Sequence, residues 1–78
     1  MEKPTIEQIG TLFSIGRRNI NNLPLLGYAL NWLRENASEA QVAMEINRVN
    51  KLATESKLDD DTYFDSPIWR DFRVKYEE

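Results

Sequence analysis

The most apolar run of the chain is residues 23–33, with the sequence LPLLGYALNWL. Read as a helix, this run departs from large apolar residues or alanine only at Gly27 and Asn31, and Arg34 follows at the same spacing. A helix with one such narrow polar stripe is buried on its other sides. The pattern therefore predicts a central helix over about residues 24–35, with the rest of the chain packed around it.

A helix start is encoded just after Pro4. Thr5 is a residue type that caps helices, and Gln8, three positions later, can bond back to the backbone N–H of the cap. The apolar residues that follow share one helical face; they are Ile6, Ile9, Leu12 and Phe13. We expect this helix to end near residues 14–16, because Gly16 permits the backbone to turn.

A second short helix is predicted from about Arg17 to Leu23. On a helical wheel one face combines two arginines with two asparagines, and the opposite face is apolar. The polar residues are Arg17, Arg18, Asn21 and Asn22, and the apolar ones are Ile20 and Leu23. Pro24 then ends this helix and can begin the central one, because a missing N–H matters little in a first turn.

The segment after the central helix repeats the capping pattern. Ser38 and Gln41 have the same spacing as the first pair, which predicts a further helix from this point. Its apolar stripe is Val42, Ile46, Val49 and Ala53. Its charged residues alternate in sign at helical spacing, as is typical of a solvated face; they are Glu45, Arg48, Lys51 and Glu55. The connector is short, so this helix is expected to fold back antiparallel on the central one.

The C-terminal third begins with a polar, acidic loop at residues 56–62, and Pro67 then opens a last helix that extends to about Tyr76. Residues 72–76 also alternate between apolar and charged, as a strand does. Helix is favoured, because the chain has no second convincing strand for pairing. We therefore predict a single all-α domain over residues 1–78, a small bundle of four to five short helices around the central apolar helix.

The amino-acid composition limits the kinds of chemistry that the protein can perform. The chain has 78 residues with no cysteine and no histidine, so disulfides and the common zinc and iron ligands are absent. It also has no glycine-rich phosphate loop, so we expect no enzyme, no cofactor and no metal. A core of this size is marginal alone, so we expect self-association or a partner. Neither a membrane-spanning run nor a signal-peptide pattern is present, and we expect a soluble, cytoplasmic protein.

The charge is distributed unevenly. The net charge is −3, but residues 1–34 carry four basic and two acidic side chains, whereas residues 35–78 carry six basic and eleven acidic ones. The front of the chain therefore has a net charge of +2 and the remainder −5. Such a chain could bind nucleic acid only through its front, and it is not a general polyanion-binding protein.

Residues 5–23 carry the pattern that a helix-turn-helix requires. Its first helix places an apolar residue before a small one, here Ile9 and Gly10, and a tight turn and a base-reading second helix follow. The packing positions are filled by Phe13, Ile15, Ile20 and Leu23. The stretch FSIGRRNINNL, residues 13–23, resembles the bipartite helix-turn-helix of many bacterial and phage regulators.

That resemblance implies that four polar residues face the major groove of double-stranded DNA, namely Arg17, Arg18, Asn21 and Asn22. Arginine can form two hydrogen bonds with guanine, and asparagine can do the same with adenine. The implied protein is a small DNA-binding transcriptional regulator, expected to be a homodimer. The alternative interpretation of these residues is a pair of short core helices with a solvated Arg/Asn face.

A second hypothesis concerns the acidic residues of the C-terminal third, which are flanked by aromatic ones. The set is Asp59, Asp60, Asp61, Tyr63, Phe64, Asp65 and Trp69. Aromatic side chains are favoured anchors of interfaces, and acidic clusters can dock on a basic surface. The set therefore suggests a protein–protein interaction module, an inhibitor or adaptor of the kind that phages encode, which binds a partner with a basic surface. The alternative is that the aromatic residues are core and the aspartates keep the loop soluble.

The same aspartates have a spacing similar to that of a calcium-binding loop. The loop requires glycine at its sixth place and glutamate at its twelfth. Phe64 and Arg70 occupy those places here. A solvated acidic loop is therefore the better interpretation.

Overall fold

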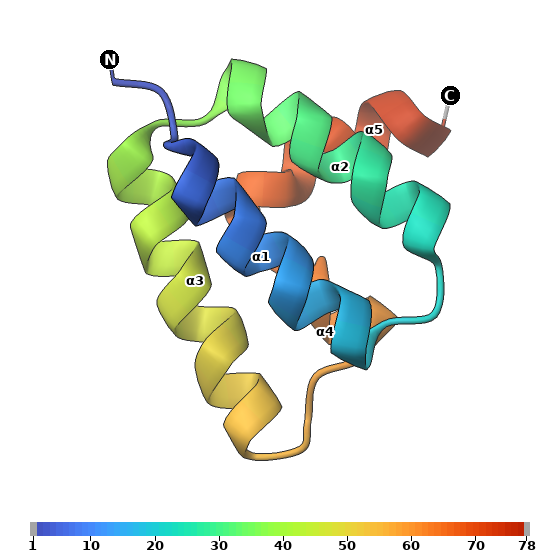
Figure 1. Cartoon of the computed structure of the whole chain (residues 1–78). Coiled ribbons are helices and arrows are strands. Elements are labelled where there is room, and N and C mark those ends of the chain that lie inside the picture. Colours follow the sequence, from blue (N-terminus) through green and yellow to red (C-terminus); the bar gives the residue numbers. More distant parts are fainter. Residues whose placement is uncertain (1, 78) are drawn as a thin grey trace.

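The chain forms a helical bundle, which a computed structural model describes for residues 2–77 (Figure 1). The part described contains no strand, which confirms the predicted all-α class and the helical interpretation of residues 67–76. The elements are α1 (Ile6–Asn19), α2 (Leu23–Asn36), α3 (Glu39–Thr54), α4 (Asp60–Tyr63), the 3₁₀ turn η1 (Pro67–Trp69) and α5 (Arg70–Glu77).

Two of the helix starts are capped as the sequence predicts. The Gln8 N–H donates to the Thr5 hydroxyl, and the Thr5 N–H donates to the Gln8 side chain, each at 3.0 Å. Ser38 and Gln41 form the same reciprocal pair at the start of α3. These boxes satisfy N–H groups that the first turn of a helix leaves without partners.

The predicted break at residues 14–16 is wrong, because α1 continues without interruption to Asn19. Gly16 lies inside the helix and is buried. A Cβ atom at this position would lie 2.9 Å from Cδ1 of Leu26 and 3.1 Å from Cε2 of Tyr63. The glycine therefore serves the close approach of two side chains to α1, and no turn depends on it.

The separate helix predicted for residues 17–23 is consequently also wrong. Arg17 and Arg18 occupy the last turn of α1, where positive charge is favourable at the negative end of the helix dipole. Asn21 and Asn22 lie in the connection to α2. The Asn22 side chain caps α2 by accepting a hydrogen bond from the N–H of Leu25 at 3.1 Å.

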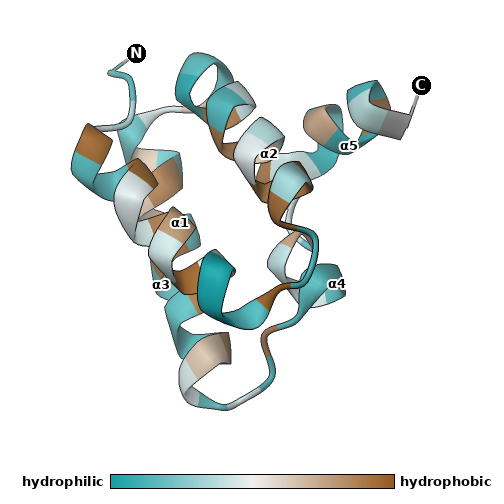
Figure 2. Cartoon of the chain, turned by 45° about the vertical axis from the view of Figure 1, so that its right-hand side comes forward, coloured by the Kyte–Doolittle hydropathy of each residue, from teal (hydrophilic) through white to brown (hydrophobic). Residues whose placement is uncertain are grey.

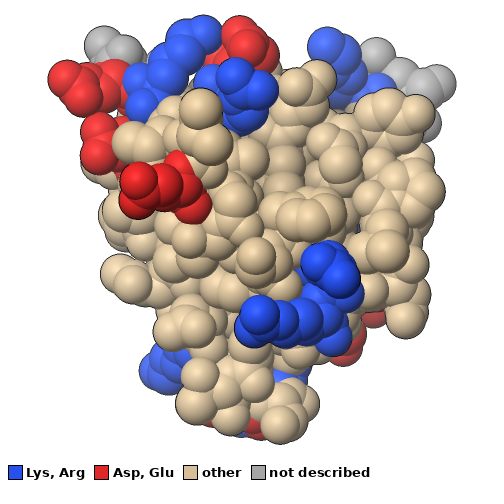
Figure 3. Space-filling view, viewed as in Figure 1, with Lys and Arg blue, Asp and Glu red and all other residues tan. Residues whose placement is uncertain are grey.

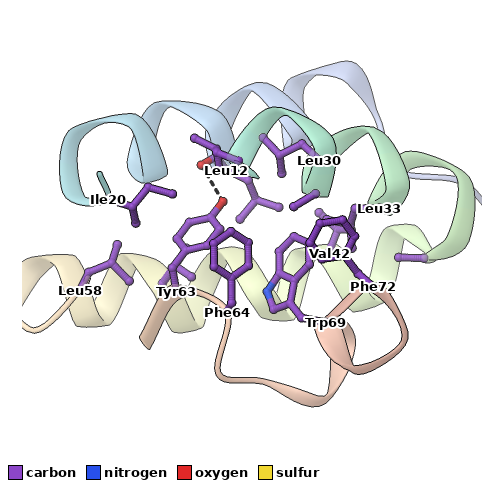
Figure 4. Close-up of a cluster of buried hydrophobic side chains, with 14 residues drawn as sticks. Leu12, Ile20, Leu30, Leu33, Val42, Leu58, Tyr63, Phe64, Trp69 and Phe72 are labelled. Carbon is purple, nitrogen blue, oxygen red and sulfur yellow. Dashed lines mark hydrogen bonds between the residues drawn. The ribbon is translucent and has the colours of Figure 1, made fainter. Parts of the chain in front are cut away.

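The core lies where α1 packs against both α2 and α3, and the C-terminal segment closes it from behind (Figure 1). Hydrophobic and hydrophilic segments alternate along α1, as expected for an amphipathic helix (Figure 2). The buried hydrophobic residues are Leu12, Ile20, Leu26, Ala29, Leu30, Leu33, Ala37, Val42, Val49, Leu58, Tyr63, Phe64, Trp69 and Phe72. Figure 4 shows the aromatic members of this set, which come from the C-terminal segment, beneath the leucines of α1 and α2.

The charged row predicted as a solvated face on α3 is wrong at Glu45. This side chain is only 4% exposed, and Arg48 donates to both of its oxygens, at 3.0 and 2.8 Å. Arg48 also donates to the carbonyl oxygens of Thr62 and Tyr63, at 2.8 and 2.6 Å. The C-terminal segment covers Glu45, and burial of a charge is tolerated here because it is paired and hydrogen-bonded.

The acidic loop contains a short helix that the sequence analysis did not identify. Asp59 accepts a hydrogen bond from the Thr62 N–H, and the Thr62 hydroxyl accepts one from the Asp59 N–H, each at 2.8 Å. This reciprocal cap begins α4 and turns the chain toward η1. The described residues include no helix long and apolar enough to cross a membrane.

Candidate interaction surfaces

The two predicted DNA-contacting arginines are exposed at the C-terminal end of α1. Neither Arg17 nor Arg18 forms an ion pair within the described part of the chain. Positive charge at this end of the helix stands out against a largely uncharged surface (Figure 3). The arginines are therefore available to an external partner.

The two predicted DNA-contacting asparagines do not share a helical face with the arginines. The backbone N–H groups of Asn21 and Asn22 donate to the two carboxylate oxygens of Asp60, at 2.7 and 3.0 Å. The same asparagines line a shallow depression together with Asp59, Asp60 and Asp61. The structure thus brings the two asparagines next to carboxylates, which repel a phosphate backbone.

The aromatic anchors predicted in the C-terminal third are wrong, because all three are core residues. Tyr63 and Trp69 are fully buried, and Phe64 is nearly so. The Tyr63 hydroxyl donates to the carbonyl oxygen of Leu12 at 3.0 Å (Figure 4). The ring of Phe64 lies edge-on to both of the others, with centroids 4.8 Å from Tyr63 and 5.3 Å from Trp69. These rings fill the space beneath α1 and α2, so Tyr63 and Trp69 are closed to a partner and Phe64 exposes only 6% of its surface.

The acidic members of that set have different roles. Asp59 caps α4, and the hydrogen bond from the Thr62 N–H lowers the pKa of its carboxyl group. Asp60 holds the connection between α1 and α2 through the two hydrogen bonds described above. Asp61 and Asp65 are exposed and form no ion pair among the described residues. These two carboxylates are the ones free to contact a partner.

A different set of aromatic residues packs between α2 and α5, and two of its members reach the surface. The ring centroids of Tyr28 and Tyr76 are 6.4 Å apart, and those of Trp32 and Phe72 are 5.8 Å apart. Tyr28 is 63% exposed and Tyr76 is 51% exposed. The four rings line a groove of about 570 Å³, with Asn31, Glu35, Asn36 and Lys75 as the other lining residues.

A second groove runs along the other side of α5. It has a volume of about 520 Å³ and is lined by Asn22, Leu25, Asp60, Asp61, Thr62, Phe64, Asp65, Phe72, Arg73 and Tyr76. Phe72 and Tyr76 line both grooves, so the two meet at these residues. We call the combined surface the α2–α5 groove. It joins exposed aromatic rings to four carboxylates, those of Glu35, Asp60, Asp61 and Asp65.

The sequence analysis did not assign Tyr28, Trp32, Phe72 and Tyr76 to a site. The signal that could have identified them is spacing: Tyr28 and Trp32 are four residues apart on one helix, and so are Phe72 and Tyr76 on another. Residues four apart lie on one face of a helix. Two such aromatic pairs on facing helices are sufficient to line a groove.

No group of three or more acidic, histidine or cysteine residues is placed to hold a metal ion within residues 2–77. Comparison with protein-family models, with curated proteins and with solved structures gives no match to this chain. The arguments for function therefore come from the geometry and chemistry of these surfaces.

Proposed function

We propose that this protein is a protein-binding module, an inhibitor or adaptor, that holds a basic amphipathic segment of its partner in the α2–α5 groove. The observation that carries this proposal is that an aromatic groove and an acidic groove meet at Phe72 and Tyr76, which line both. One end offers aromatic rings to apolar side chains, and the other offers carboxylates to cations.

The aromatic end has the composition of an interface centre. Tyr28 and Tyr76 expose more than half of their surface, and Trp32, which lines the same groove, is partly exposed. Tyrosine and tryptophan supply much of the binding energy at interfaces, because they bury a large apolar area and retain a polar group. An apolar side chain of a partner would therefore pack against the exposed faces of these rings.

The acidic end determines the charge of the partner. Asp60, Asp61 and Asp65 line it, and Arg73 is its single cation. Complementary charges at the rim of an interface raise the association rate and select the orientation of the partner. A lysine or arginine next to the apolar anchor of the partner would satisfy both ends of the groove.

The experiment is a selection of random peptides displayed on phage against the full chain. Peptides with an aromatic or leucine anchor next to lysine or arginine should be enriched. Their binding should weaken as salt rises and should shift the amide signals of α2 and α5. The selected peptides should fail to bind a Tyr28→Gln, Tyr76→Gln variant and should bind the control Met44→Gln, which changes an exposed residue of α3. Acidic peptides, or amide shifts only outside α2, α4 and α5, would contradict the proposal.

Binding of double-stranded DNA by a small transcriptional regulator is a second candidate. The observation in its favour is that Arg17 and Arg18 are exposed, lack ion-pair partners among the described residues and lie on a largely uncharged surface. Guanidinium groups bind phosphates and guanine edges well. Asp60, bound to the neighbouring backbone, opposes this function.

An amide NMR titration of the labelled protein with mixed-sequence duplex at low salt tests this candidate. DNA binding predicts shifts centred on residues 17–22 that weaken with added salt. An Arg17→Ala, Arg18→Ala variant should lose them, whereas Lys51→Ala, an exposed cation of α3, should retain them. An absence of shifts at a large excess of duplex would exclude this function.

A further inference from the structure

The outer face of α1 carries exposed apolar residues around a glycine. Ile6, Gly10, Phe13 and Arg17 are spaced by three or four residues and share one side of the helix. Ile6 is 84% exposed and Phe13 is 42% exposed. A Cβ atom at Gly10 would meet nothing within 4 Å. The surface of α1 is therefore exposed backbone at Gly10, next to an exposed aromatic ring.

Nothing inside the described chain explains why this residue is glycine. Glycine within a helix is less stable than alanine, because the unfolded chain has more conformational freedom to lose. Gly16 is explained by the side chains of Leu26 and Tyr63 that approach it. Gly10 has no such neighbour, so its backbone is open to close approach by a side chain from another molecule.

The charges of α1 favour one particular occupant. Glu7 lies at the start of the helix and Arg17 and Arg18 lie at its end, with no charged residue between them. None of the three forms an ion pair within residues 2–77. Two copies of α1 placed antiparallel bring each Glu7 next to the arginines of the other copy, whereas a parallel pair would place like charges together.

We propose that two copies of the chain form a homodimer through antiparallel α1 helices, with Phe13 of each copy packed against the exposed backbone at Gly10 of the other. In this register Ile6 faces Arg17 of the other copy. The aliphatic part of that arginine covers Ile6, and its guanidinium reaches Glu7. The contact is isologous, so a two-fold axis closes it. A core of this size gains stability from a dimer that only the folded chain can form.

The dimer leaves the proposed binding groove free. In Figure 1, α5 lies behind α2, whereas α1 lies at the front. The outer face of α1 and the α2–α5 groove are thus separate surfaces. Association of two chains and capture of a basic peptide can therefore succeed or fail independently of each other.

The test measures the mass of the full chain in solution by sedimentation equilibrium up to about 1 mM. The wild type should move from 9.1 kDa toward twice that mass as its concentration rises. Phe13→Glu and Gly10→Gln should each raise the dissociation constant at least about tenfold. Val74→Glu, a matched change of an exposed apolar residue on α5, should leave it unchanged. Circular dichroism checks that each variant is folded, which is expected because all three positions are exposed.

A charge-exchange pair tests the register. A Glu7→Arg variant and an Arg17→Glu, Arg18→Glu variant should each be monomeric, because each carries one sign of charge at both ends of α1. An equimolar mixture should form a heterodimer, because opposite charges then meet at both ends. The proposal is overturned if the wild type stays at 9.1 kDa throughout. It is also overturned if Phe13→Glu and Gly10→Gln associate like the wild type, or if the mixture stays monomeric while the wild type dimerises.

Discussion

The indole N–H of Trp69 donates to the carboxylate of Glu45 at 2.8 Å, in the interior of the molecule. This bond links η1 to the middle of α3. The other groups that contact the carboxylate are the Arg48 guanidinium and the Ser66 hydroxyl, which donates at 3.1 Å. Every buried polar side-chain atom in the described part of the chain has a partner. The C-terminal segment is therefore anchored by polar bonds as well as by its aromatic rings.

Replacement of Glu45 by alanine should strongly destabilise the fold. The change leaves the Trp69 N–H without its acceptor and the Arg48 guanidinium without its carboxylate partner, and removal of one partner from a buried ion pair costs about 3–5 kcal/mol. Urea unfolding, followed by circular dichroism, measures this loss. Glu45→Gln should lose less, because it retains one acceptor oxygen of the same shape.

The matched control is Glu55→Ala, which removes an exposed glutamate at the end of the same helix. It should change the free energy of unfolding by no more than about 0.5 kcal/mol. If Glu45→Ala and Glu55→Ala were equally stable, the buried network would not anchor the C-terminal segment.

Replacement of Gly16 by alanine should destabilise the chain, although alanine is the better helix former. The added methyl group meets Leu26 and Tyr63, both fully buried, and overpacking of this kind costs about 1–3 kcal/mol. Gly27→Ala on α2 is the matched control, because nothing lies within 4 Å of its Cβ position. That variant should gain about 0.5–1 kcal/mol. A lower urea midpoint for Gly16→Ala together with a higher one for Gly27→Ala would confirm that Gly16 is required for packing. A higher midpoint for both variants would contradict this role.

Features encoded by neighbouring residues could be predicted from the sequence. The caps of α1 and α3 depend on pairs three residues apart, and the apolar stripes of α2 and α3 depend on helical spacing. Both are local properties. The class of the fold follows from them, because no segment has a strand partner.

Features that depend on contacts between distant residues could not be predicted. In the sequence alone, Gly16 is typical of a turn residue. Its actual role depends on Tyr63, which is far along the chain but packs against it. The charge pattern around Glu45 does not differ from that of an exposed helix. The side chain is buried only because Trp69, from a distant part of the chain, packs over it and donates a hydrogen bond to it.

The candidate site was missed for the same reason. The sequence shows that the C-terminal third is rich in aromatic residues but does not show which rings face inward. Tyr63, Phe64 and Trp69 are buried, whereas Tyr76 and the α2 residue Tyr28 remain exposed. Asp60, Asp61 and Asp65, which the sequence pattern places in a candidate protein-binding surface, line the acidic half of the α2–α5 groove.

The stability of the protein should fall at alkaline pH because of Tyr63. Burial raises the pKa of its hydroxyl above the ordinary value of 10.0, and the nearby charge of Glu45 adds to this effect. The folded state therefore binds the phenolic proton more tightly than the unfolded state does. The stability that this difference in pKa contributes to the fold is fully present below pH 10, and it is lost as the pH rises toward the folded-state pKa of Tyr63. Above pH 10 the free energy of unfolding should fall by up to about 1.4 kcal/mol per pH unit.

Urea unfolding between pH 8 and 11 measures this dependence, with Tyr63→Phe as the comparison. The variant loses the hydrogen bond to the Leu12 carbonyl and should be less stable by about 1 kcal/mol at neutral pH. It should then show a smaller decline above pH 10. An equally steep decline in both proteins would assign the alkaline transition to another group.

Asp60 and Asp61 are neighbours with separable roles, one structural and one in binding. Asp60 accepts hydrogen bonds from the backbone N–H groups of Asn21 and Asn22, so Asp60→Ala should lower the free energy of unfolding by about 1–3 kcal/mol. Amide hydrogen exchange should accelerate at those two residues. Asp61 forms no ion pair among the described residues, so Asp61→Asn should leave both measurements unchanged.

The same two variants connect stability with the proposed function. Asp61→Asn removes one negative charge from the α2–α5 groove without removing a bond that the fold requires. Its association rate with a selected basic peptide should fall, and the fall should be larger at low salt, because rim charges act mainly on encounter. Stopped-flow measurements at two salt concentrations provide this comparison. If Asp61→Asn bound the peptide as fast as the wild type did, the acidic half of the groove would have no part in recognition.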